Sequence, residues 1–337
     1  QEGFHHASPK NVGSLVRNVF IYSFFIDILG ALIFFFHWKD KVPAGKALFQ
    51  SVFHSISAFC NAGFSTFSNS FEDYVLDFPV NITLILLIVL GGMGFLVINE
   101  GREYLGSIFK RKKFKLSLHT KMVVFLTIFL IFVSLAVFLL LEWHHSLDGF
   151  STLDKIMAAL FQITAPRTAG FNTMDLDTLG LATIFLFLFL MFVGASPGST
   201  GGGIKTSTVG VIFAFLKSRV RARDSVHIFR RTLPQGLILK AFTLFTLAVV
   251  VILISAFVLF ILHPEFGMKN ILFEVYSAFG TVGLSLGITP KLGGFGKGVI
   301  IMTMYIGRIG PLTLLYAFSR RRPFGKYEFV EETIMIG

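Results

Sequence analysis

The sequence is poor in charged residues, in acidic residues and in cysteine. Only 15% of its 337 residues are charged, with 19 Asp and Glu against 30 Lys and Arg, and Cys60 is its one cysteine. Soluble domains carry about 25% charged residues, so this composition excludes a single soluble globule. A lone cysteine also excludes a disulfide-built scaffold.

Apolar residues are abundant instead, at 54% of the chain with 42 Phe. About 20 consecutive apolar residues are needed for a helix to cross a bilayer. Apolar runs of roughly this kind occupy residues 15–38, 78–98, 121–142, 180–194, 235–262 and 294–319. The sequence therefore predicts an all-α polytopic protein of the cell membrane.

Three shorter segments of mixed character lie between these runs, at residues 46–60, 152–165 and 268–279. They are too short to cross the hydrocarbon core, but they have the length of a helix that enters the membrane and returns. We expect each to be a re-entrant half-helix.

Basic residues give the chain a net charge of +11, which in a soluble protein would suggest nucleic-acid binding. If the short segments are re-entrant, twenty of the 30 Lys and Arg residues fall on one side of the membrane and seven on the other. The positive-inside rule assigns the richer side to the cytoplasm. We therefore expect cytoplasmic N- and C-termini and no nucleic-acid partner.

The half-helices end in a repeated pattern, [ST]-A-[FP]-x-[NT]-[AV]-G-[FL], at residues 57–64, 164–171 and 277–284. The pattern glycines Gly63, Gly170 and Gly283 are 107 and 113 residues apart. Three matches in the same topological place indicate three helix–pore-loop–helix units around a central pore. We place these units at residues 1–110, 111–230 and 231–337.

Such a loop can present backbone carbonyls to a cation. Carbonyl oxygens replace the hydration shell of K⁺ in channel filters, and glycine allows positive φ without a side chain in the path. An alternative is that these glycines only permit close helix packing. The predicted filter residues are Cys60, Asn61, Ala62, Gly63, Arg167, Thr168, Ala169, Gly170, Gly280, Thr281, Val282 and Gly283.

Carbonyl filters in potassium channels are built from four loops, and this sequence supplies three. The chain starts in a polar stretch just before a predicted spanning helix, where an earlier unit would end. We therefore expect that a first pore unit is missing from this sequence. A protein of three units is the alternative.

A second feature is a run of small residues inside the fourth apolar stretch. Broken helices at membrane depth commonly mark an ion or substrate path, so we expect a flexible plug, or gating loop, across the pore. A simple kink and a surface loop are alternatives, whereas the spacing of a phosphate-binding loop is lacking. The predicted gating-loop residues are Gly194, Ser196, Pro197, Gly198, Ser199, Thr200, Gly201, Gly202, Gly203 and Lys205.

Ionisable residues at membrane depth are costly and usually have partners. Arg308 in the last apolar run is expected to limit conduction, to pair with plug carbonyls, or to tie two helices together, with Glu274 as a possible partner. Arg167 is expected to brace its loop by donating to carbonyls. Asp27 is a polar group of the first span to which no role is assigned.

Acidic residues outside the loops could concentrate cations at the pore entrance. They are Glu72, Asp73 and Asp77 beyond the first loop, and Asp175 and Asp177 beyond the second.

Together these stretches resemble the Trk/Ktr/HKT potassium transporter superfamily, most closely the membrane subunit of the bacterial Ktr systems. The matching segments are residues 53–64, 114–121, 166–171, 194–208, 228–231, 277–284 and 307–312. The resemblance implies K⁺ uptake through four units with one glycine in each filter loop. By that match, Gly63, Gly170 and Gly283 are the filter glycines, residues 194–205 the gating loop and Arg308 the pore arginine, with K⁺ held at filter carbonyls.

The resemblance also implies a homodimer in the lipid bilayer. Its partner would be a cytosolic ring of RCK-type regulatory subunits of the KtrA and KtrC kind, which bind ATP or ADP. Na⁺ often stimulates uptake, and no organic cofactor is expected in this chain. A Na⁺- or H⁺-coupled transporter of another substrate is the alternative. An enzyme is not expected, because no nucleophile or set of carboxylates converges at membrane depth.

Overall fold

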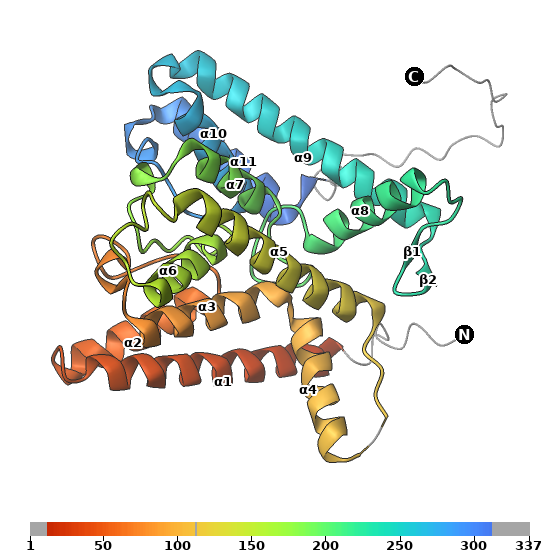
Figure 1. Ribbon diagram of the computed structural model, residues 1–337, viewed down its shortest axis with the longest axis horizontal. Helices are drawn as coiled ribbons and strands as arrows, with labels where there is room; N and C mark the ends of the chain where they lie inside the picture. The colour runs from red at the N-terminus through yellow and green to blue at the C-terminus, as the bar shows by residue number, and fades with distance from the viewer. Residues whose placement is uncertain (1–11, 112, 312–337) are drawn as a thin grey trace.

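The computed structural model describes residues 12–111 and 113–311, and these form an almost entirely helical protein (Figure 1). The prediction of an all-α membrane protein is confirmed. Residues 1–11, 112 and 312–337 lie outside the described residues. They include both termini and some of the basic residues that were counted to predict the cytoplasmic side.

The helices follow one another in three groups along the chain, and in each group a long first helix is followed by a shorter one. The first group is α1 (Val12–Trp38), α2 (Ala44–Phe59), α3 (Phe78–Met93) and α4 (Phe95–Phe109). The second is α5 (Leu118–Glu142), α6 (Thr152–Thr164), α7 (Leu181–Phe192) and α8 (Thr206–Val220). The third is α9 (Gln235–Leu262), α10 (Gly267–Gly280) and α11 (Gly294–Ile309).

The short helices α2, α6 and α10 coincide with the predicted half-helices to within two residues at each end. Helix starts are fixed by local chemistry. Ser151 caps α6 by accepting the amide of Asp154 at 3.3 Å, and Ser117 caps α5 by accepting the amide of Thr120 at 3.2 Å. Each cap satisfies a backbone donor that the first helical turn leaves free.

Three described helices are long and apolar enough to cross a membrane, namely α1, α5 and α9. The predicted run 78–98 is not one helix, because it breaks at Gly94 and α4 turns by 103° from α3. Gly94 has a φ of +91°, and a Cβ there would lie 2.5 Å from the carbonyl oxygen of Pro197. The turn therefore depends on glycine at this position.

The last apolar run breaks in a similar way. Helix α11 ends at Ile309, and Gly310 follows with a φ of +92°. A Cβ at Gly307 would overlap the carbonyl oxygen of Phe279, just as one at Gly91 would overlap that of Phe59. Helices α3 and α11 thus approach the ends of their half-helices in the same manner.

The outer surface is apolar where a membrane would contact it. Phe20, Phe24 and Phe36 of α1 expose 72%, 64% and 62% of their surface. Phe34, which lies about opposite Phe36 around the same helix, is fully buried and stacks on Trp38 at 5.0 Å. The C-terminal half of α1 therefore has one exposed apolar face and one face packed on α2 and α3, with which α1 makes most of its contacts.

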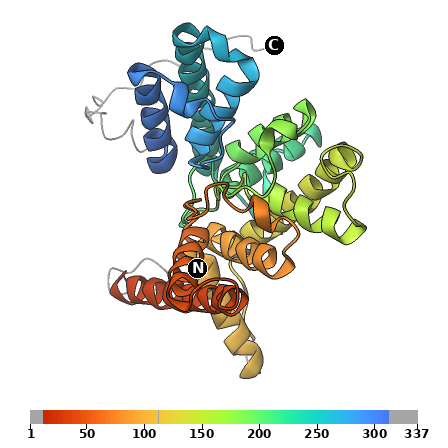
Figure 2. The ribbon, with the colours of Figure 1, turned by 90° about the vertical axis from the view of Figure 1, so that its left-hand side faces the viewer.

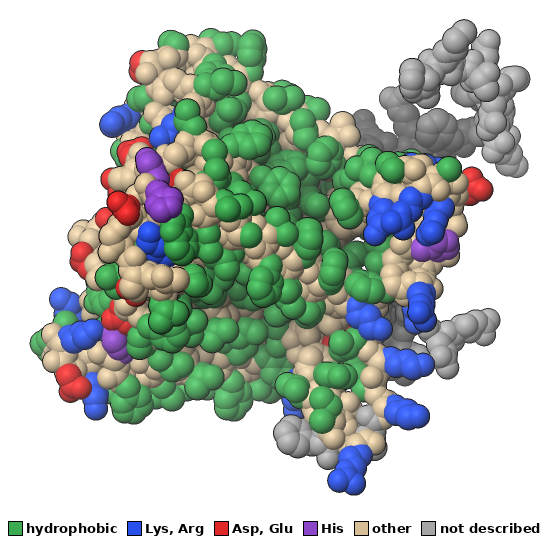
Figure 3. Space-filling view, viewed as in Figure 1, with side chains coloured by type: hydrophobic (Ala, Val, Ile, Leu, Met, Phe, Trp, Pro, Cys, Tyr) green, Lys and Arg blue, Asp and Glu red, His purple; other side chains and the backbone are tan. Residues whose placement is uncertain are grey.

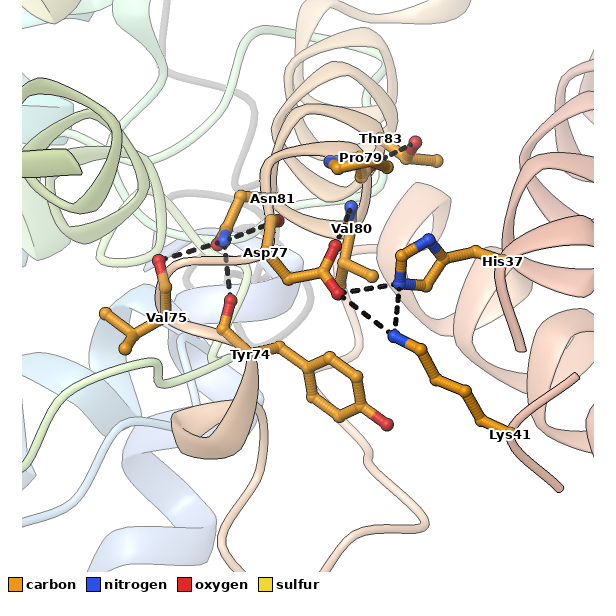
Figure 4. Close-up of polar contacts among 9 residues, drawn as sticks. All are labelled: His37, Lys41, Tyr74, Val75, Asp77, Pro79, Val80, Asn81 and Thr83. Atoms are coloured by element: carbon orange, nitrogen blue, oxygen red, sulfur yellow. Dashed lines mark hydrogen bonds and ion pairs between the residues drawn. The ribbon is translucent and has the colours of Figure 1, made fainter. Parts of the chain in front are cut away.

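A polar cluster joins the end of α1 to the start of α3 (Figure 4). The Asp77 carboxylate lies 2.6 Å from His37 Nε2 and 3.5 Å from Lys41 Nζ, and it also accepts the amide of Val80. The Asn81 amide donates to the carbonyls of Tyr74, Val75 and Asp77. Asp77 is therefore a helix cap and an ion-pair partner.

Charge is distributed unevenly over the molecule. In Figure 3, many Lys and Arg side chains gather at the end formed by α8, α4 and the hairpin of β1 (His227–Ile228) and β2 (Arg231–Thr232), whereas most acidic side chains lie along the opposite edge. The apolar belt lies between these two ends. This asymmetry agrees with a cytoplasmic side at the α8 end.

Viewed from the side, the three helix groups lie around a centre where their connecting loops meet (Figure 2). The half-helices α2, α6 and α10 each end toward this centre, and the residues that follow them form the candidate site.

Candidate functional site

The three loops that follow the half-helices share one backbone path. Each has two residues of positive φ separated by one residue: Asn61 and Gly63 (49° and 72°), Thr168 and Gly170 (72° and 77°), and Thr281 and Gly283 (50° and 94°). Residues other than glycine seldom adopt positive φ, so the same departure at three equivalent asparagine or threonine positions marks a common structure.

The three glycines lie side by side although they are far apart in sequence. A Cβ on Gly63 would lie 2.6 Å from the carbonyl oxygen of Ala169 and 3.0 Å from the Cα of Gly170. A Cβ on Gly170 would overlap the carbonyl oxygen of Val282 and lie 3.4 Å from the Cα of Gly283. The structure therefore brings the three predicted filter loops together, with backbone carbonyls between them.

Hydroxyl groups at the ends of two half-helices hold these loops. Ser57 Oγ donates to the carbonyl of Phe64 at 2.8 Å, and Ser277 Oγ donates to the carbonyl of Leu284 at 2.6 Å. The equivalent Thr164 donates back to Leu160 within its own helix at 2.7 Å. The first and third loops are thus fastened alike, and the second differs.

A second set of polar side chains fastens the chain beyond each glycine. Nε2 of His54 lies 3.2 Å from Ser65 Oγ and accepts the amide of Thr66 at 3.1 Å. The Glu274 carboxylate accepts hydrogen bonds from the hydroxyls of Ser285 and Thr289, the latter at 2.7 Å.

Gln162 does the same in the middle unit, where its amide donates to Asn172 Oδ1 and Thr173 Oγ1 at 3.5 and 3.4 Å. The sequence analysis did not assign His54 and Gln162 a role in the site. For His54 the sequence signal is positional, because His54 and Glu274 both lie nine residues before their loop glycine, whereas Gln162 lies eight residues before Gly170.

The half-helices also contribute an electrostatic field. The C-terminal ends of α2, α6 and α10 all precede the central loops, and each helix end carries about half a negative charge from its aligned peptide dipoles. Three such ends near one point favour a cation there.

The predicted gating loop connects α7 to α8 and touches the end of α2, α3, and the second and third central loops. Thr200 Oγ1 donates to the carbonyls of Phe59 and Gly91 at 3.3 and 3.1 Å. A Cβ on Gly201 would lie 2.9 Å from Thr168 Cβ, and one on Gly202 would lie 3.0 Å from the carbonyl oxygen of Gly280. The small residues allow this close approach.

Internal bonds hold this loop in place, so it is neither a simple kink nor a surface loop. A parallel bridge pairs Val193 with Ile204, and Lys205 Nζ donates to the carbonyl of Gly201 at 2.7 Å. The hydroxyls of Ser196 and Thr206 lie 2.9 Å apart. The expected flexible plug is thus an ordered loop in this conformation.

Arg308 contacts the loop directly, since its guanidinium donates to the backbone carbonyl of Thr200. This is one of the expected arrangements, pairing with a plug carbonyl. The suggested pairing with Glu274 is wrong, because Glu274 is engaged with Ser285 and Thr289.

Two other charged residues lie in the predicted membrane part of the chain, namely Arg167 and Asp27. Arg167 is buried, with 8% of its surface exposed, but within the described residues its Nε has no hydrogen-bond partner and no bond to a carbonyl is formed. In the first span, the carbonyl of Asp27 accepts Ser55 Oγ at 2.7 Å, and the carboxylate Oδ1 is unpaired within the part described.

The acidic residues beyond the first loop are mostly engaged in protein contacts. Glu72 accepts the amide of Asn172 at 3.0 Å, Asp73 accepts that of Asn69 at 3.0 Å, and Asp77 pairs with His37. They link neighbouring segments and are not a free ring of charge.

Known proteins are similar to this chain. The family model described as "TrkH: Cation transport protein" matches residues 7–329. The chain belongs to the TrkH cation transport family. The family is one of membrane transport proteins and not of enzymes.

Among TrkH-family relatives, the chain is 36% identical to Ktr system potassium uptake protein B of Bacillus subtilis over 323 residues, which is 95% of this chain and 71% of that protein. It is 36% identical to the Vibrio alginolyticus protein of the same name over 100% of this chain and 73% of that protein. The crystal structure of the potassium transporter TrkH from Vibrio parahaemolyticus shares the fold, with a TM-score of 0.76, 22% identity and coverage of 94% and 66% of the two chains.

Proposed function

We propose that this TrkH-family chain mediates K⁺ uptake across the cell membrane, with its three glycine loops as part of the selectivity filter. The observation that carries the proposal is that Gly63, Gly170 and Gly283 lie together, with the carbonyl oxygens of Ala169 and Val282 between neighbouring loops. Carbonyl oxygens at such a point substitute for the hydration shell of a cation. The potassium-uptake relatives of the chain support K⁺ as the ion.

We assign the segment 194–205 as the gate of this pathway and Arg308 as the residue that both narrows the pore and holds the gate. Its Gly201 and Gly202 lie against Thr168 and Thr281 of the second and third loops, and Thr200 is bonded to the end of α2, so we place the segment in the path of an ion leaving the filter. The bond from Arg308 to Thr200 favours the closed position.

We further infer that the chain works as a homodimer with a cytosolic ring of nucleotide-binding RCK-type subunits and responds to Na⁺. The support is the identity to Ktr system proteins together with the basic end formed by α4, α8 and the hairpin (Figure 3). The coupled-transporter alternative would need several free carboxylates along the path, whereas Glu274 is held by two hydroxyls and Asp27 is the one buried carboxylate with an unpaired oxygen in the part of the chain described.

The decisive experiment measures K⁺ uptake by the full-length gene in bacteria that lack their own K⁺ systems, with Gly283→Ser beside wild type. Growth rescue by wild type, with weaker K⁺ affinity or selectivity in the variant, supports the proposal. Failure of wild type even with its cytosolic ring supplied would overturn K⁺ uptake. Equal rescue by both would leave transport in place but remove Gly283 from the filter.

A further inference from the structure

The end of α8 and the segment that joins it to α9 carry positive charge that the ion path itself does not use. This stretch contains Lys217 and Arg219 of α8 and Arg221, Arg223, Arg230 and Arg231 after it, and Asp224 is its one acidic residue. Within the described residues, none of these six side chains takes part in an ion pair. The positive charge is therefore available to an external anion.

A two-residue hairpin in this segment is folded against α5. Its turn residues Phe229 and Arg230 have φ of 46° and 64°, which a turn of this type normally gives to Asn and Gly. The Phe229 ring meets Phe125 of α5 edge to face at 6.0 Å, and His227 lies within 3.0 Å of Thr232 Oγ1 and 2.8 Å of Ser225 Oγ. An unfavourable turn held by such contacts indicates a hairpin with a defined position.

Between this hairpin, α5 and α8 lies a groove of about 330 Å³. Its lining combines the apolar side chains of Phe125, Leu126 and Phe213 with the basic side chains of Lys217, Arg221 and Arg223. Gly210 of α8 also lines the groove, and a Cβ there would lie 2.6 Å from Leu126 Cδ1 of α5.

We propose that this groove binds an anionic phospholipid of the leaflet at the basic end of the protein. Its phosphate would lie among Lys217, Arg221 and Arg223, and an acyl chain would follow Phe125 and Phe213 into the membrane. Basic pockets between membrane helices on the cytoplasmic side are suited to anionic head groups, and each nearby Lys or Arg adds attraction. The proposal does not depend on the ion that the protein carries.

The two-part chemistry of the groove favours a lipid over other anions. A free phosphate would use the three cations but leave the apolar half unfilled, and Phe213 is 65% exposed. An acidic protein segment would likewise bring charge without an aliphatic chain. A phospholipid matches both the basic and the apolar part of the groove lining.

The test uses the full-length protein in a neutral detergent, with dioctanoyl phosphatidylglycerol as the probe and binding measured by native mass spectrometry. Dioctanoyl phosphatidylcholine and inorganic phosphate are the comparison ligands. We expect tighter binding of phosphatidylglycerol than of either. The double variant Arg221→Gln/Arg223→Gln should bind it about 30-fold more weakly, from the loss of two cations near a membrane surface.

Two further variants separate a built site from general surface charge. Lys110→Gln/Lys113→Gln removes the same charge from the same side outside the groove and should leave binding unchanged. Ala214→Phe keeps every charge but fills the apolar half, and it should abolish phosphatidylglycerol binding while the melting temperature is retained.

Three outcomes would overturn the proposal. One is equal binding of phosphatidylcholine and phosphatidylglycerol. Another is an equal loss in the Lys110→Gln/Lys113→Gln control. The third is phosphatidylglycerol binding that inorganic phosphate matches and Ala214→Phe does not alter, which would make the site one for a free anion.

Discussion

The guanidinium of Arg308 donates a hydrogen bond to the backbone carbonyl of Thr200, and this bond joins α11 to the loop between α7 and α8. Thr200 is also tied through its hydroxyl to the carbonyls of Phe59 and Gly91. One loop residue thus connects the last described helix, the first half-helix and α3. The loop position is therefore set by contacts from two other helix groups.

Replacing Arg308 by Gln should accelerate uptake. A hydrogen bond to a charged group contributes about 1.5–3 kcal/mol, and losing the lower amount shifts a two-state loop about tenfold toward its open position. The measurement is the initial rate of K⁺ uptake per amount of membrane protein. Arg102→Gln is the matched control, since Arg102 lies on α4 and donates to the hydroxyl of Tyr22 at 2.8 Å. An unchanged or lower rate in Arg308→Gln would argue against its holding role.

Thr200→Val should have a smaller effect in the same direction, on the order of threefold, because it removes one shared neutral hydrogen bond and keeps the side-chain volume. Combined with Arg308→Gln, the increase should be less than the product of the two single effects, since both bonds hold one loop. A fully multiplicative double variant would show that the residues act independently.

The filter glycines should differ in their tolerance of alanine. In Gly170→Ala the new methyl overlaps the carbonyl oxygen of Val282, so we expect loss of uptake and a lower melting temperature. In Gly283→Ala the methyl meets only Gly170 Cα at 3.7 Å. The remaining cost is that of alanine in a backbone conformation of positive φ, about 1–2 kcal/mol. That variant should fold and conduct with weaker preference for K⁺ over Na⁺. The reverse order of damage would contradict the geometry.

Glu274 should affect the selectivity for K⁺ over Na⁺, because it holds the residues that follow the third loop glycine. Glu274→Leu leaves the hydroxyls of Ser285 and Thr289 without their acceptor, at a cost of about 1–3 kcal/mol, and should lower both the melting temperature and the K⁺-to-Na⁺ uptake ratio. Glu274→Gln retains an acceptor oxygen and should recover part of both. Glu265→Gln, at an exposed site, is the control. An unchanged ratio in Glu274→Leu would restrict the residue to a structural role.

The half-helices could be predicted closely because their length and their shared ending are local properties. Residues 268–279 were expected to form a half-helix, and α10 occupies Gly267–Gly280. The break at Gly94 was missed because the run 78–98 is mostly apolar. Hydropathy alone gives no information about a change in the direction of a helix. The glycines of the Gly91–Gly94 stretch are the sequence signal of this break. The need for glycine at residue 94 comes from the nearby carbonyl of Pro197, whose position is known only from the fold.

Side-chain partners were less predictable than backbone elements. Glu274 was expected to reach Arg308 because opposite charges at membrane depth attract, yet its partners are the hydroxyls of Ser285 and Thr289, in the loop after its own helix. Arg167 was expected to donate to carbonyls, and no such bond forms within the described residues. Sequence supplies the type of group, whereas the direction of a side chain depends on packing.

The three glycine loops are encoded at separate places in one gene, at Gly63, Gly170 and Gly283. A single codon change therefore alters one side of the proposed ion path and leaves the others as they were. In a channel assembled from identical subunits, the same change would appear on every side at once. Ion preference in a single-chain pore can thus be adjusted during evolution in small, graded steps.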